Sequence, residues 1–137
     1  MLMRILLMLI LCGFLTACRG NPAPAGTGAR EAVKKYFEAL AGQDWDAAYA
    51  LVHNDTQKQM DRAAFERNAQ VYRQQLGFTL GKVFIRSCDE QGEKAVAQVN
   101  LSDANGSMKN RFHEGVILQR GPGGWGVVLP GNFGQAR

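Results

Sequence analysis

A change of hydrophobic period near residue 80 constrains this chain more than any other feature of its sequence. From Ala29 to Leu76, apolar residues recur at intervals of three and four, the spacing that places them on one face of a helix. From Leu80 to Leu129, apolar residues alternate with polar ones, as they do in strands with one buried face. Helices followed by strands predict an α+β domain whose helices pack on one face of an antiparallel sheet.

Three helices are predicted in the first half of the chain. The first begins near Ala29 and ends at Gly42, a residue that commonly terminates helices. The second is short and begins at Asp44, whose carboxylate can accept hydrogen bonds from the first free backbone N–H groups. Asp61 caps the third helix in the same way, and Gly77 ends it.

Four strands in a meander are predicted in the second half. We expect a bulge at Gly81 in the first strand and a hairpin turn at residues 105–106, Asn-Gly, between the second and third. Glu114 interrupts the apolar face of the third strand, and the alternation places its side chain inward. The apolar strand residues are Leu80, Val83, Phe84 and Ile85; Ala95, Ala97, Val99 and Leu101; Phe112, Val116 and Leu118; and Trp125, Val127 and Leu129.

Apolar and aromatic residues also form three short patterns. They are Ala32-Val33-x-x-Tyr36-Phe37-x-x-Leu40, then Asp44-Trp45-x-x-Ala48-Tyr49-x-Leu51, and finally Gly123-Gly124-Trp125-x-Val127. Together they resemble the nuclear transport factor 2-like superfamily over about residues 29–129. The resemblance implies three N-terminal helices, the first of them long, packed on a curved four-stranded antiparallel sheet to form a cone with a pocket inside.

The first 17 residues have the organisation of a secretory signal. Arg4 precedes an apolar core from Ile5 to Leu15, and small residues lie just before Cys18. The apolar run before Gly13 is about a dozen residues long, whereas a membrane-spanning helix needs roughly 20. Residues 15–18, Leu-Thr-Ala-Cys, resemble the bacterial lipoprotein signal, in which the cysteine is lipidated and becomes the new amino terminus. We therefore expect Cys18 to attach the chain to a membrane.

The processed chain is expected to have three parts. Residues 18–28 are rich in glycine, proline and alanine and predict a flexible tether, residues 29–130 form the domain, and residues 131–137 form a loose C-terminal tail. Arg19, in place of an aspartate after the cysteine, is similar to the signal for outer-membrane sorting in enteric bacteria. The predicted location is the cell envelope, on the outer membrane facing the periplasm, with the inner membrane as the alternative.

Charge and cysteine usage exclude several kinds of function. Removal of Arg4 with the signal lowers the formal net charge from +4 to +3, and the basic residues are dispersed, so we expect no nucleic-acid binding. Cys88 is the one cysteine left after processing and lipidation, so we expect a half-buried strand residue, with an intermolecular bridge or a reactive thiol as alternatives. The two histidines lie far apart, which predicts no metal site, and we expect no cofactor.

Two side chains are candidate acids or bases. Glu114 would face a pocket inside the sheet and could act as a base near Tyr36 or Tyr49, although a slip in register would turn it outward. His53 lies with Asp55 at the end of the second helix, where a histidine also interacts favourably with the helix dipole. His113 alternates away from Phe112 and is expected to face solvent.

Four aromatic residues are candidate pocket residues, and each is also explained by core packing. They are Tyr36, Tyr49, Tyr72 and Trp125. The predicted function is a non-catalytic binding module of the envelope that holds a small apolar ligand, a peptide or another envelope protein. The alternatives are a pocket enzyme of the isomerase or dehydratase type, as the resemblance implies, and a structural homodimer built through the sheet.

Overall fold

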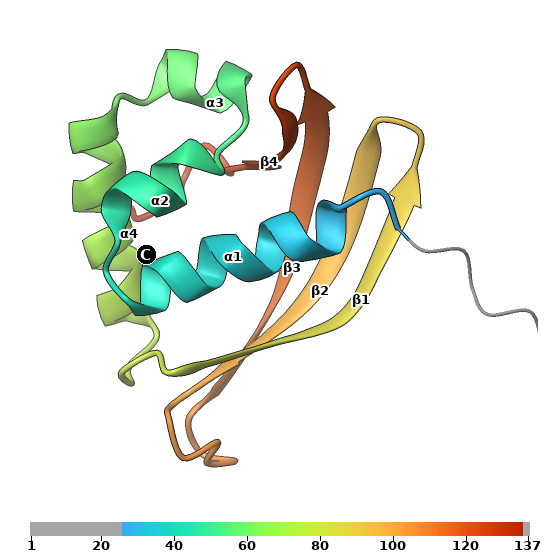
Figure 1. Cartoon of the computed structure of the whole chain (residues 1–137). Coiled ribbons are helices and arrows are strands. Elements are labelled where there is room, and N and C mark those ends of the chain that lie inside the picture. Colours follow the sequence, from blue (N-terminus) through green and yellow to red (C-terminus); the bar gives the residue numbers. More distant parts are fainter. Residues whose placement is uncertain (1–25, 136–137) are drawn as a thin grey trace, which may run out of the picture.

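The computed structural model describes residues 26–135, which form four helices and one four-stranded antiparallel sheet (Figure 1). The strands follow one another in the order β1-β2-β3-β4, as expected for a meander. The predicted α+β class is therefore confirmed. The elements are α1 (Ala29–Ala41), α2 (Trp45–Ala50), α3 (Asn54–Gln59), α4 (Arg62–Gln75), β1 (Lys82–Gln91), β2 (Lys94–Ser102), β3 (Arg111–Gly121) and β4 (Gly124–Val128).

The core lies between α1 and the sheet, and α1 crosses one face of the strands (Figure 1). The buried side chains of α1 have the predicted spacing of three and four, including Val33, Tyr36 and Leu40. Alternate residues of β2 and β3 are buried opposite them, as the period of two predicted. Burial of each large apolar side chain contributes about 1.5–3 kcal/mol to folding.

A fourth helix, α3, is an element that the sequence did not predict. It spans Asn54–Gln59 and has no buried residue, so it carries no apolar stripe from which a helix could be recognised. His53 forms its N-terminal cap, with Nδ1 accepting a hydrogen bond from the Asp55 backbone N–H at 3.3 Å. Residues 26–135 therefore contain four helices, where the sequence predicted three. His53 is buried at the start of the additional helix.

The strand register differs from the prediction at the first strand. The irregularity in β1 lies between Ile85 and Ser87, so the predicted bulge at Gly81 is wrong. Gly81 lies before β1, where an added Cβ would come within 2.5 Å of the Ala104 backbone nitrogen. The connection from β2 to β3 contains the expected turn, with Gly106 at φ 70°, but it spans residues 103–110 and is not a two-residue loop.

The segment after β4 returns to the core. Phe133 is buried and lies 5.9 Å from Phe65 and 5.5 Å from Tyr72, measured between ring centroids. Gln75 Nε2 donates a hydrogen bond of 2.7 Å to the Gln135 carbonyl. The expected loose tail from residue 131 is therefore wrong as far as Gln135, because an aromatic side chain holds this segment against α4.

The chain before α1 is held by a carboxylate from β1. Glu90 accepts hydrogen bonds from the backbone N–H groups of Thr27 and Ala29 and from the Thr27 hydroxyl. Gly28 occupies the N-cap and has no side chain to cap the helix, so Glu90 does this from a distant strand. The predicted signal, Cys18 and the tether up to residue 25 lie outside the described residues. Within residues 26–135, none of the helices has the length and apolar character needed to cross a membrane.

Candidate functional site

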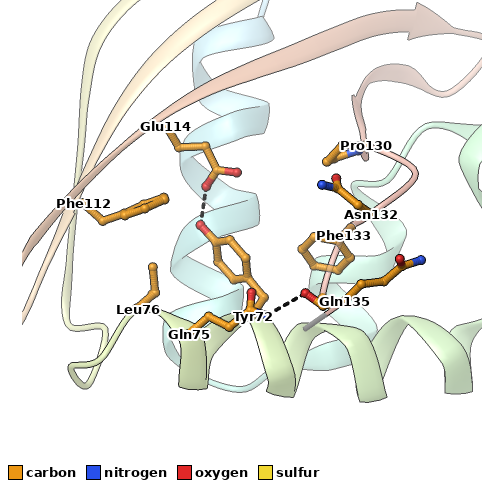
Figure 2. Close-up of a pocket in the computed structure, with 10 residues that line it drawn as sticks. Tyr72, Gln75, Leu76, Phe112, Glu114, Pro130, Asn132, Phe133 and Gln135 are labelled. Carbon is orange, nitrogen blue, oxygen red and sulfur yellow. Dashed lines mark hydrogen bonds between the residues drawn. The ribbon is translucent and has the colours of Figure 1, made fainter. Parts of the chain in front are cut away.

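A pocket of about 380 Å³ lies between α4, β3 and the segment that follows β4 (Figure 2). Phe112 and Leu76 form one side of it, and Pro130 and Phe133 form the other. Pockets of this size, in which polar groups lie among apolar side chains, are typical of small-molecule sites. The lining residues are Tyr72, Gln75, Leu76, Phe112, Glu114, Pro130, Asn132, Phe133, Gly134 and Gln135.

Glu114 and Tyr72 meet in this pocket. Glu114 pairs with Val99 in the β2–β3 register, which turns its side chain inward as the alternation predicted. The Tyr72 hydroxyl, from α4, donates a hydrogen bond to the Glu114 carboxylate (Figure 2). Burial raises the pKa of Tyr72, and the charge of Glu114 raises it further. The phenol therefore stays protonated at neutral pH and acts as a donor.

Tyr36 borders a second pocket, of about 160 Å³, which shares Glu114, Pro130 and Phe133 with the first. Tyr36 is 2% exposed, and its hydroxyl has no hydrogen-bond partner among residues 26–135. Burial, and then the charge of Glu114, raises the pKa of Tyr36 well above its usual range. Glu114 is thus near two neutral phenols, Tyr72 in the larger pocket and Tyr36 in the smaller.

The chemistry of this arrangement favours recognition of donors. A carboxylate has about four lone-pair positions and can accept several hydrogen bonds, so a ligand donor can join the Tyr72 hydroxyl at Glu114. The Tyr72 proton points at the carboxylate and is not offered to an oxygen on a ligand. Among residues 26–135, no cluster of three or more histidine, cysteine, aspartate or glutamate side chains could hold a metal ion.

Two of the predicted pocket residues, Tyr49 and Trp125, lie elsewhere. The Tyr49 hydroxyl donates a 2.9 Å hydrogen bond to the Met60 carbonyl and so joins α2 to the end of α3. The Trp125 indole N–H donates a 2.9 Å hydrogen bond to the Thr27 hydroxyl, beside the start of α1. Both aromatic residues hold segments of the chain together and line neither pocket of Glu114.

His53 does not join Glu114 either. It lines a depression of about 50 Å³ with Trp125 and the glycines of the β3–β4 turn. An added Cβ on Gly126 would come within 2.6 Å of the His53 Cα, so the backbones pack tightly there. His113 is exposed on β3, as expected.

Cys88 has the surroundings of a structural cysteine. It lies on β1, is partly buried and packs against the core. Burial, and then the charge of Glu90, raises the pKa of its thiol. A raised pKa disfavours the thiolate, which is the reactive form.

The sequence did not predict the side of the pocket formed by the C-terminal segment. Asn132, Phe133 and Gln135 fall in a stretch rich in glycine, asparagine and glutamine, which favours a loop. Phe133 was the one signal available, because a large aromatic side chain in a polar segment is often buried.

Comparison with known proteins supports a fold and no particular activity. No protein-family model matches the sequence, and no curated protein matches it. Among solved structures, the chain is similar to an NTF2-like transpeptidase from Campylobacter jejuni, with a TM-score of 0.57 and 13% identity over 74% of this chain and 97% of that one. Identity this low is informative about the fold alone. The fold of this chain is therefore that of the nuclear transport factor 2-like proteins.

Proposed function

We propose that this protein is a non-catalytic binding module, attached to the bacterial envelope through a lipid on Cys18. Its ligand is a small molecule with an apolar body and a polar group that donates hydrogen bonds. The observation that supports this is the Glu114 carboxylate, held by Tyr72 in a pocket with apolar sides. The Cys18 anchor rests on residues 15–18, which resemble a lipoprotein signal.

The apolar side chains of the pocket favour the apolar body of such a ligand, and the Glu114 carboxylate favours its hydrogen-bond donor. Phe112, Leu76 and Phe133 offer apolar surface, and each Å² of apolar surface removed from water contributes about 25 cal/mol. Glu114 attracts a donor or a cation and repels an anion, and this effect is stronger in a partly buried site than in water. A neutral or cationic head group is therefore favoured over a carboxylate.

A series of compounds with one chain and different head groups tests this proposal. We expect octylamine and octanamide to bind the purified mature protein more tightly than octanoate, by about tenfold or more, since tenfold corresponds to about 1.4 kcal/mol. Glu114→Gln should abolish the preference for octylamine over octanoate. Glu93→Gln, a change in the β1–β2 turn, should leave it intact. Equal affinities in the parent protein, or no binding of any compound, would exclude the proposed ligand class.

The second candidate function is a pocket enzyme that moves a proton. It is favoured by the inward position of Glu114 in an open pocket, where a carboxylate can act as a general base. It is less favoured than binding because the Tyr72 proton is directed at Glu114 and not at a developing negative charge. Exchange of the α-hydrogens of 2-octanone for deuterium, faster with the protein and lost in Glu114→Gln, would favour the enzyme.

A structural homodimer is the third candidate. Val96 and Ile117 are partners in the β2–β3 register, and they are 48% and 56% exposed on the face of the sheet away from the core. Phe84 on β1 is 64% exposed. Sedimentation of the parent protein and of Ile117→Lys tests this candidate, since a sheet-mediated dimer should dissociate in the variant.

A further inference from the structure

The exposed apolar side chains of this protein gather on one side of the sheet. Within residues 26–135, the large hydrophobic side chains that are exposed all lie on β1, β2 and β3 or in the connection between β2 and β3. Val96 and Ile117 are register partners, and alternation places them opposite the buried residues of their strands. The helix α1 crosses the other face (Figure 1). The exposed set is Phe84, Val96, Met108 and Ile117.

Basic side chains lie beside the apolar ones. Lys82, Ser102 and Arg111 form a row across β1, β2 and β3, because Ser102 is the register partner of both basic residues. Neighbouring strands lie about 4.8 Å apart, so the long side chains of the two outer residues can reach one anionic group above the hydroxyl. We call the surface formed by Lys82, Phe84, Val96, Ser102, Arg111 and Ile117 the uncovered face.

A groove of about 480 Å³ joins the two basic residues to an exposed aromatic ring. Phe84 and Asn100, which are register partners, line it together with Lys82, Ser102 and Arg111. None of the residues described around this groove is acidic. The hydroxyl and the amide can donate hydrogen bonds to phosphate oxygens, as the two cations also do. The groove thus combines positive charge, hydrogen-bond donors and an aromatic side chain.

The charge of the uncovered face favours an anionic partner over a second copy of the chain. Lys82, Lys94 and Arg111 are exposed on strands β1 to β3. Among the described residues that share this side of the three strands, Asp89 is the one acidic residue, opposite Val96. Two copies packed through this face would bring like charges together, which is costly, whereas an anionic surface would neutralise them.

The chain before the domain keeps this face near the proposed membrane anchor. Thr27 is held at one end of the sheet by Glu90 of β1 and Trp125 of β4. Residues 19–25 lie between Cys18 and Gly26, the first described residue. A fully extended chain spans at most about 3.6 Å per residue, so Gly26 lies within roughly 30 Å of Cys18. A lipid on Cys18 would therefore hold the end of the sheet close to the bilayer.

We propose that the uncovered face lies on the surface of an anionic phospholipid bilayer, with phosphate head groups at Lys82 and Arg111. This inference rests on the anchor proposed at Cys18 and adds the orientation of the domain. Basic side chains attract anionic head groups, and exposed apolar side chains enter the boundary between head groups and acyl chains. The Glu114 pocket lies on the other side of the sheet, so in this orientation its ligand enters from the aqueous side.

The test is co-sedimentation with vesicles of phosphatidylcholine and phosphatidylglycerol in equal parts, and with vesicles of phosphatidylcholine alone. The protein is the chain from residue 18 onward with Cys18→Ser, so that no attached lipid contributes. We expect binding to the anionic vesicles, weakened by added salt, and none to the neutral ones. Lys82→Gln combined with Arg111→Gln should weaken binding by about tenfold or more, because each basic side chain near an anionic surface contributes roughly fivefold.

A second pair of substitutions is the matched control. Lys35→Gln combined with Arg67→Gln removes the same charge from exposed positions on α1 and α4 and should have little effect. Phe84→Ala should weaken vesicle binding without loss of thermal stability, because the side chain is exposed. Octylamine binding should be unchanged in the variant of Lys82 and Arg111, so failure of this inference leaves the proposed ligand site standing.

Four outcomes would overturn the inference. They are equal weakening by the two pairs of substitutions, equal binding to neutral vesicles, no binding to anionic vesicles, and a dimer of the parent protein that Ile117→Lys dissociates. In the last case, a second copy of the chain would cover the face.

Discussion

Tyr36 and Tyr72 are buried phenols near the same carboxylate, and they differ by one hydrogen bond. Tyr72 donates to Glu114, whereas the Tyr36 hydroxyl has no partner within residues 26–135. A hydrogen bond to a charged group contributes about 1.5–3 kcal/mol, and an unpaired buried polar group costs about 1–3 kcal/mol. The same substitution should therefore destabilise the protein more at Tyr72 than at Tyr36.

Tyr72→Phe should lower the free energy of unfolding by about 1–3 kcal/mol, because Glu114 loses a donor. Tyr36→Phe should change it by less than about 1 kcal/mol or increase it, because the hydroxyl that is removed has no partner. Urea denaturation of both variants measures the difference. Equal losses at the two positions would contradict the assignment of Tyr72 as the donor to Glu114.

At the scale of elements, Glu90 joins β1 to the start of α1. Two backbone N–H groups and one hydroxyl donate to its carboxylate. Arg120 donates to the same Thr27 hydroxyl, and its guanidinium lies 4.8 Å from the centre of the Trp125 ring. The Trp125 indole N–H also donates to the Thr27 hydroxyl, so side chains from β1, β3 and β4 hold the chain at the start of α1.

Glu90→Gln should make folding less sensitive to acid. The Thr27 backbone N–H, and then the Thr27 hydroxyl, lower the pKa of Glu90. A lowered pKa in the folded state adds stability above the unfolded pKa, about 4.3, and this contribution is lost as the pH falls through the folded value. Thermal unfolding of the parent protein and of Glu90→Gln at pH 7 and pH 3 measures this loss of stability. Glu93→Gln is the control. A variant that loses as much stability on acidification as the parent protein would contradict this role.

Phe133 joins the C-terminal segment to α4 and closes one side of the pocket. Phe133→Ala should cost about 3–5 kcal/mol, as for other large aromatic residues removed from a core. Asn132→Ala, at the exposed neighbouring position, should change stability by less than about 0.5 kcal/mol. Chemical denaturation compares the two. Full stability in Phe133→Ala would show that residues 130–135 do not belong to the core.

At the scale of the whole molecule, Cys18 is the proposed point of attachment to the membrane, which a labelling experiment can test. Labelled palmitate fed to a bacterium that expresses the chain should be incorporated into the parent protein and absent from Cys18→Ser. Cys12→Ser, within the predicted signal, and Cys88→Ser, within the domain, should both be labelled normally. Each buried methylene contributes about 0.8 kcal/mol, so the acyl chains would hold the parent protein on the membrane. Palmitate on Cys18→Ser would refute the anchor.

The sequence by itself determined the class of fold, because the period of its apolar residues is a local property. The period of 3.6 marked α1, α2 and α4, and the period of two placed Glu114 inward. Local signals failed for α3, which buries no side chain, and for the C-terminal segment, whose position depends on Phe133.

Only the tertiary structure decided which side chains meet. Tyr72 and Glu114 are 42 residues apart, and their contact depends on where α4 lies relative to β3. The same packing excludes Tyr49, Trp125 and His53 from the pocket. The periodicity of a sequence specifies the buried face of each element, whereas contacts between elements arise from their mutual packing, which periodicity does not encode.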